Sequence, residues 1–105
     1  MSAMGNQLHE AAKTLGESST NVDTSLIQRL SRLTGIIETD VYSAVYSIDY
    51  AVKLTRMMLP GKQVEIILDV GSAACRIGER QSIRHPVASR AIVIALLLYL
   101  GGENG

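Results

Sequence analysis

The sequence predicts an all-α fold, a compact bundle of four to five helices in a single domain spanning residues 1–105. Two observations lead to this prediction. In most segments the apolar residues recur at steps of three and four, which places them on one face of a helix. Glycine and proline stand between these segments, where helices end or begin. A chain of this length with 47% hydrophobic residues can bury one compact core.

The N-terminal half is expected to contain two short helical segments joined by a linker. Residues 6–15 predict a short N-terminal helix, residues 17–23 a polar linker, and residues 24–101 the main bundle. The first helix of the bundle is expected to begin at a capping box formed by Ser25 and Gln28. It ends near Gly35, a residue that favours the left-handed conformation after a helix.

A longer helix is predicted over residues 40–59. Its apolar residues form one stripe that only Thr55 interrupts, and they are Val41, Ala44, Val45, Ile48, Ala51, Val52, Met58 and Leu59. Pro60 and Gly61 follow at once, and both residues stop helices. We therefore expect one uninterrupted helix here.

The next segment is compatible with two patterns. The apolar residues of one pattern alternate with other residues, as they would in a strand, and they are Val64, Ile66, Leu68 and Val70. Polar residues, however, form a stripe at helical spacing, and they are Lys62, Glu65, Asp69, Ser72, Arg76, Glu79 and Arg80. We interpret this stripe as the solvent-exposed face of a helix over residues 62–81.

The last helix is expected to run from Pro86 to Leu100 and to stop at the glycines that follow. It has almost no polar face, so it is either the central helix of the bundle or one half of a subunit interface. In the second interpretation, the interface residues on this helix are Ile94, Leu97 and Leu98.

Charge, cysteine content and the longest apolar run limit the partners and the compartment that we expect for this chain. Ten basic and ten acidic residues cancel, so the chain as a whole has no long-range attraction to nucleic acid or anionic lipid. Between Ala74 and Arg90, however, four arginines accompany a single acidic residue, Glu79. The lone Cys75 excludes an internal disulfide and is typical of a cytoplasmic protein. The longest apolar run, residues 91–100, is about half of a membrane span, so no membrane partner is expected.

Residues with catalytic chemistry are few and scattered. His9 and His85 have no partner at a metal-ligand spacing, and the glycines form no phosphate-binding motif. Cys75 falls on an apolar face, where a thiol behaves as a small hydrophobic group. We therefore expect a non-enzyme with no metal, no cofactor and no small-molecule substrate.

Three arginines at steps of four form what we call the arginine series: Arg76, Arg80 and Arg84. On a continuous helix they would lie above one another over about 12 Å, a span that covers roughly two phosphate steps of a nucleic-acid strand. The series is therefore either a grip on a phosphate backbone or a solvated helix face, and the sequence leaves both open.

Three tyrosines also recur at steps of four and form what we call the tyrosine ladder: Tyr42, Tyr46 and Tyr50. Tyrosine rings offer flat area with a polar tip, which suits recognition of a partner. The alternative is a packing edge whose hydroxyls reach the rim of the core. These three residues are candidate interface residues.

The arginine-bearing segments SLIQRLSRLTG and ACRIGERQSIRHP, in a helical chain of this size, resemble the small subunits of archaeal CRISPR surveillance complexes. The resemblance implies a non-catalytic subunit of a larger nucleoprotein assembly in antiviral defense, with other protein subunits and the DNA or RNA backbone as partners. It implies backbone contacts at Arg29, Arg32, Arg76, Arg80 and Arg84. The alternative is a helical adaptor that binds other proteins or itself without nucleic acid.

Overall fold

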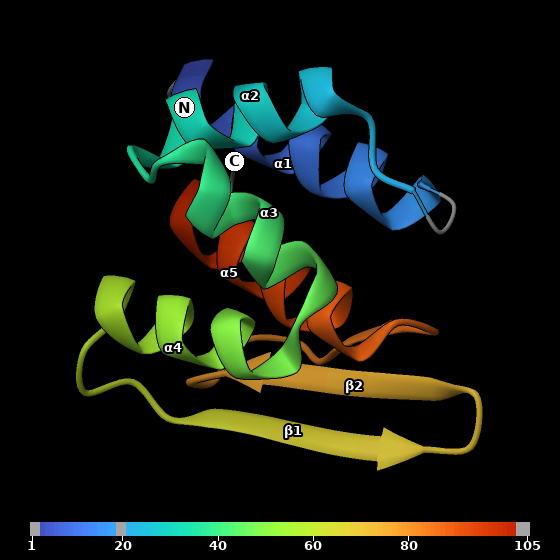
Figure 1. Cartoon of the computed structure of the whole chain (residues 1–105). Coiled ribbons are helices and arrows are strands. Elements are labelled where there is room, and N and C mark those ends of the chain that lie inside the picture. Colours follow the sequence, from blue (N-terminus) through green and yellow to red (C-terminus); the bar gives the residue numbers. More distant parts are fainter. Residues whose placement is uncertain (1–2, 19–20, 103–105) are drawn as a thin grey trace.

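The computed structural model describes residues 3–18 and 21–102 of the chain. These residues form five helices and one three-stranded antiparallel sheet (Figure 1). The prediction of an all-α fold is therefore wrong, because the fold combines helices with a sheet. The helices and strands are α1 (Ala3–Glu17), α2 (Thr24–Thr34), α3 (Glu38–Tyr46), α4 (Ile48–Met58), β1 (Val64–Asp69), β2 (Ser72–Ile77), β3 (Ile83–His85) and α5 (Ala88–Gly101).

Helix α5 is the centre of the molecule. It contacts α1, α3, α4, β2 and β3. Figure 1 shows the sheet below α5, with α1 and α2 on the opposite side. Every residue from Ala91 to Leu97 is buried. Of the two interpretations of the apolar C-terminal helix, the structure therefore supports the central helix of the core.

The N-terminal helices follow the sequence prediction with shifted ends. α1 is longer than residues 6–15, and the predicted linker, residues 17–23, lies partly outside the described residues. α2 is capped by Asp23, whose carboxylate accepts the N–H of Ser25 at 3.0 Å, so the predicted capping box is not the cap. Gly35 ends α2 in the left-handed conformation at φ 77°, as expected.

The helix predicted over residues 40–59 is broken at Ser47 into α3 and α4. Ser47 takes an extended backbone conformation, and its hydroxyl accepts the N–H of Tyr50 at 3.5 Å. Serine is a favourable first residue before a helix, because its side chain satisfies a backbone N–H that has no partner within the helix. The apolar stripe alone did not reveal this break, since both helices turn their apolar faces to the same core.

The segment predicted as a helix, residues 62–81, instead contains a β-hairpin. β1 and β2 pair around a turn at Val70 and Gly71, and Gly71 adopts φ 76°. Glu65 lies opposite Arg76 and Asp69 opposite Ser72, on the face away from α5. Residues four apart share a face in a strand as well as in a helix, so the polar stripe fitted both structures. The strand-like alternation of Val64, Ile66 and Leu68 was the correct signal.

Buried polar groups connect the core helices to their surroundings. The Ser89 hydroxyl donates to the carbonyl of Val45 at 2.6 Å and joins α5 to α3. The His85 ring accepts the N–H of Val87 at Nδ1, 3.0 Å away, so Nε2 is its donor and bonds the carbonyl of Gly16 at 3.1 Å. These bonds satisfy polar groups that would otherwise be costly to bury.

Candidate functional site

The arginine series does not form a continuous surface. Arg76 lies on β2, Arg84 on β3, and Arg80 in the connection between them. The prediction that these residues lie above one another on a helix is therefore wrong. The structure brings Arg76 and Arg84 to the outer face of the sheet and places Arg80 beside α5.

Acidic residues of β1 pair with the arginines on the outer face of the sheet. Arg76 Nη2 lies 3.1 Å from Glu65 Oε1, and Arg84 Nη1 lies 3.9 Å from Asp69 Oδ2. Arg84 also donates to the Ser72 hydroxyl at 2.9 Å. The outer face of the sheet thus carries a ladder of alternating charge, and it has no excess of positive charge to offer a phosphate.

Arg80 lies over the ring of Tyr99 on α5. The guanidinium carbon is 4.6 Å from the ring centroid, and Lys62 Nζ approaches the same ring at 5.9 Å. A cation over an aromatic face is attracted by the ring quadrupole. Arg80 therefore holds the connection between β2 and β3 against α5.

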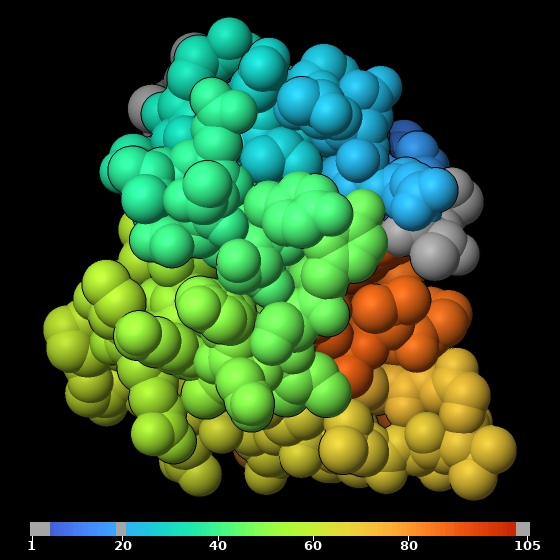
Figure 2. All heavy atoms as spheres, in the orientation of Figure 1, coloured from blue at the N-terminus to red at the C-terminus, as the bar shows by residue number. Residues whose placement is uncertain are grey.

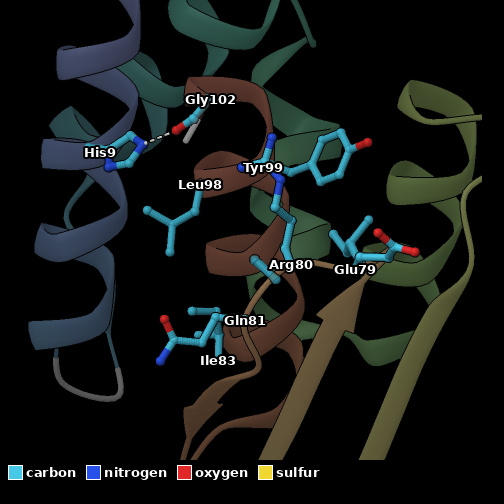
Figure 3. A pocket seen from close by; sticks show the side chains of 10 residues that line it. His9, Glu79, Arg80, Gln81, Ile83, Leu98, Tyr99 and Gly102 are labelled. Atoms are coloured by element: carbon cyan, nitrogen blue, oxygen red, sulfur yellow. Dashed lines mark hydrogen bonds between the residues drawn. The ribbon is translucent and has the colours of Figure 1, made fainter. Parts of the chain in front are cut away.

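A cavity of about 440 Å³ opens beside this stack, between α1, α5 and the connection from β2 to β3 (Figure 3). Its floor is apolar, and Ile77, Ile83 and Leu98 line it. Glu79 and Arg80 both border it, so it carries charges of both signs. The cavity accordingly favours neither an anionic nor a cationic group.

At one end of this cavity, His9 of α1 meets the last turn of α5. His9 Nε2 lies 3.0 Å from the carbonyl of Gly102, as Figure 3 shows. A Cβ atom on Gly101 would stand only 2.5 Å from the ring of His9. Glycine at this position therefore allows α1 and α5 to approach each other closely.

Arg29 and Arg32 lie on α2 and line two hollows against α1, of about 470 and 300 Å³. Arg29 donates to the hydroxyl of Thr14 at 3.4 Å. Arg32 is exposed. Each hollow also includes an acidic residue, Glu10 in one and Asp23 in the other. The structure brings these two arginines together on α2, apart from Arg76, Arg80 and Arg84.

The break at Ser47 divides the tyrosine ladder. Tyr42 and Tyr46 remain in contact on α3, with ring centroids 4.8 Å apart, whereas Tyr50 belongs to α4. The Tyr46 hydroxyl accepts the N–H of Val22 at 2.7 Å, and the guanidinium of Arg90 lies 5.4 Å from its ring. Tyr46 therefore packs as an edge of the core, while Tyr42 and Tyr50 are 56% and 49% exposed.

Exposed apolar side chains gather on α3 and α4. We call this group the α3–α4 surface, and it consists of Tyr42, Tyr46, Ile48, Tyr50 and Met57. In Figure 2, α3 and α4 form much of the face toward the viewer. Tyr42 borders a hollow of about 370 Å³ shared with α2, and Tyr50 and Met57 border another of about 210 Å³ with Asp40 and Lys53. Apolar side chains beside hollows with charged rims are typical of protein-binding surfaces.

The interface candidates on the last helix are placed differently. Ile94 and Leu97 are buried in the core of α5, and Leu98 is half-buried at the cavity of Figure 3. Ile94 and Leu97 are consequently core residues and offer no surface to a second subunit.

Cys75 is fully buried on β2, and burial raises the pKa of its thiol from 9.0 to about 11. The thiol is therefore protonated at neutral pH. Among the described residues, no three histidine, cysteine or carboxylate side chains gather as a metal site. No helix within the described ranges is long and apolar enough to cross a lipid bilayer.

Sequence reasoning missed two features of the surface. The first is the position of β1 at the edge of the sheet that the described residues form, which a predicted helix over residues 62–81 concealed although the alternation of Val64, Ile66 and Leu68 indicated a strand. The stack of Arg80 on Tyr99 had no signal in the sequence, because 19 positions separate the two residues.

Comparison of the chain with protein-family models, with curated proteins and with solved structures gave no match.

Proposed function

We propose that this chain is a non-catalytic small subunit that assembles with other protein chains through the α3–α4 surface. The observation that supports it is the exposure of aromatic and long aliphatic side chains there. Tyr42 is 56% exposed, Tyr50 49% and Met57 67%. Tyrosine and methionine are enriched at the centres of protein interfaces, where they bury large area at modest cost in side-chain entropy.

The charges on the sheet also favour protein contact. Arg76 and Arg84 pair with acidic residues of their own chain, and Arg80 stacks on Tyr99. A phosphate backbone would have to displace these partners, and the displaced carboxylates would repel it.

The experiment that tests the proposal compares the proteins retained by three tagged chains in their native cell extract. The variant Tyr50→Ser with Met57→Ser removes apolar area from the α3–α4 surface. The matched control, Lys13→Ser with Gln28→Ser, changes two exposed polar residues of α1 and α2. We expect the wild type and the control to retain the same proteins in stoichiometric amounts, and the surface variant to lose them. Equal retention by all three chains would contradict the proposal.

A nucleoprotein role is the second candidate, and Arg29 supports it. Its Nε atom is buried and has no hydrogen-bond partner among the described residues. Arg32 lies exposed beside it on the same hollows. Together they could hold one phosphate group, in keeping with the role predicted from the sequence. Replacing both by glutamine should reduce co-purification of nucleic acid with the assembled complex, and unchanged co-purification would remove this candidate.

A further inference from the structure

The strand β1 forms one edge of the sheet. The strand order is β1-β2-β3, so within the described residues β1 pairs with β2 alone. Figure 1 shows β1 at the lower margin of the molecule, with no helix or strand beyond it. An edge strand presents backbone N–H and C=O groups to which another strand can bond.

The turn between β1 and β2 determines which residues bond outward. A two-residue turn at Val70 and Gly71 is closed by a hydrogen-bonded pair, here Asp69 and Ser72, and bonding then alternates along the strand. At the other end of the hairpin, the N–H of Gly78 donates to the carbonyl of Gln63 at 2.8 Å. This bond fits the same alternation of bonded and non-bonded pairs. The odd-numbered residues of β1 therefore bond to β2. The outward-pointing backbone groups belong to Val64, Ile66 and Leu68.

This edge has few of the features that usually prevent strands from pairing, because its two charged residues, Glu65 and Asp69, already pair with arginines of the same sheet. All three outward-bonding residues are apolar, and β1 contains neither proline nor lysine. Ile67 is 52% exposed, Leu68 67%, and Val70 in the adjoining turn is fully exposed. A six-residue edge strand with exposed apolar side chains at Ile67 and Leu68 favours addition of another strand.

We propose that β1 pairs in antiparallel fashion with β1 of a second copy of this chain, around a two-fold axis at Ile66. The pairing joins two three-stranded sheets into one sheet of six strands. This pairing is a second protein contact besides the α3–α4 surface. It rests on the proposed function in one respect only, namely that the chain acts by binding protein.

Charge disfavours the register centred one residue farther along β1. In an antiparallel pair, residues that lie opposite each other point to the same face of the sheet. A two-fold axis that relates two copies of β1 must therefore pass between one residue and the same residue of the second copy. At Ile66, Val64 lies opposite Leu68 of the second copy, and Glu65 lies opposite Ile67. At Ile67, the next possibility, Glu65 would lie directly opposite Asp69, and like charges in that position are destabilising.

The chemistry of the edge fits an identical strand. In the Ile66 register, all three residues that exchange backbone hydrogen bonds meet apolar partners. Glu65 and Asp69 remain on the outer face of the sheet, where Arg76 and Arg84 already pair with them. Because the edge is short, the contact belongs to the small, transient class of interface, and the dimer should depend on concentration.

Sedimentation equilibrium over a concentration series tests the dimer. We expect the wild type to shift from monomer to dimer, and Leu68→Lys to weaken dimerisation by at least about tenfold because it places a charge opposite Val64 of the second copy. The matched control is Ile37→Lys, just before α3, since Ile37 is 64% and Leu68 67% exposed and the chemical change is the same kind. It should leave the dissociation constant within about twofold. Circular dichroism verifies that both variants stay folded.

Disulfide cross-linking tests the register. Cys75 lies opposite Ile66 in the hairpin, so the test uses a Cys75→Ala background. There, Ile66→Cys should oxidise to a covalent dimer, since paired residues bring their Cα atoms to about 5.5 Å. Leu68→Cys alone should not form a covalent dimer, because the two cysteines at position 68 would lie far apart in this register. A mixture of Val64→Cys and Leu68→Cys chains should cross-link.

The outcomes separate this inference from the proposed function. A wild type that remains monomeric at every concentration overturns the dimer, even if the chain retains other proteins through β1. Loss of the dimer in Ile37→Lys but not in Leu68→Lys also overturns the edge pairing. Equal retention of partner proteins by all three chains of the previous experiment contradicts the proposed function and leaves the sedimentation result untouched.

Discussion

Glu65 and Arg76 lie directly opposite each other on β1 and β2, with 3.1 Å between Oε1 and Nη2. In the helix predicted from the sequence, the same two residues would lie about 16 Å apart along the axis. This pair therefore distinguishes the hairpin from a helix by a measurable interaction.

The first prediction uses this pair. Arg76→Glu should lower the free energy of unfolding by about 0.5–1 kcal/mol, because it sets two carboxylates opposite each other on an exposed face. The double variant Glu65→Arg with Arg76→Glu should recover most of that loss. Denaturant unfolding of the wild type, both single variants and the double variant gives the coupling energy. A coupling of zero would favour the helix.

Some of the fold could be predicted from the sequence, and the reasons are local. Gly35 ended α2 as expected, because a helix followed by a left-handed residue leaves a direct mark in the sequence. The apolar run of α5 indicated a buried helix, because no face of it suits water. Both features depend on neighbouring residues alone.

The hairpin and the break at Ser47 could not be predicted in the same way. The spacing of Glu65 and Asp69 is compatible with one face of a helix and with one face of a strand, so the polar stripe could not decide between them. The break at Ser47 lies between two helices that both contact α5, and contacts between residues far apart in the sequence leave no mark in the spacing of apolar residues. The partners of the arginines likewise come from pairing across strands, which spacing along the chain does not encode.

The second prediction concerns the contact between α1 and α5. Gly101→Ala should destabilise the chain by about 1–3 kcal/mol, because the added Cβ would stand 2.5 Å from the His9 ring. His9→Ala removes the ring, so the double variant should lose less than the two single losses combined. Thermal unfolding of the three variants measures this, and strictly additive losses would count against the close approach.

The third prediction separates the roles of two tyrosines. Tyr46→Phe removes the hydroxyl that accepts the N–H of Val22, so it should lower the free energy of unfolding by about 1 kcal/mol. Tyr42→Phe, at a ring that is 56% exposed, should change it by less than about 0.5 kcal/mol. Equal losses in denaturant unfolding would contradict the packing role of Tyr46.

The fourth prediction concerns alkaline pH. The pKa of Cys75 is about 11 in the folded chain and 9.0 without burial. Below pH 9 the thiol is protonated in both states, and between pH 9 and 11 only the unfolded chain ionises, so stability should fall as pH rises. The loss should reach about 2–3 kcal/mol, and Cys75→Ala should lack this component. If the stability of the wild type and of Cys75→Ala falls equally with rising pH, Cys75 is not the group responsible.

The most direct test of protein contact through apolar side chains is the salt dependence of the native assembly. The tagged chain is purified with its partners and washed from about 0.1 M to about 1 M salt, a range over which the screening length falls from about 10 Å to 3 Å. Contact through the α3–α4 surface predicts that the same proteins stay bound throughout, because apolar burial responds little to screening. Release of the chain together with nucleic acid as the salt rises would contradict the account.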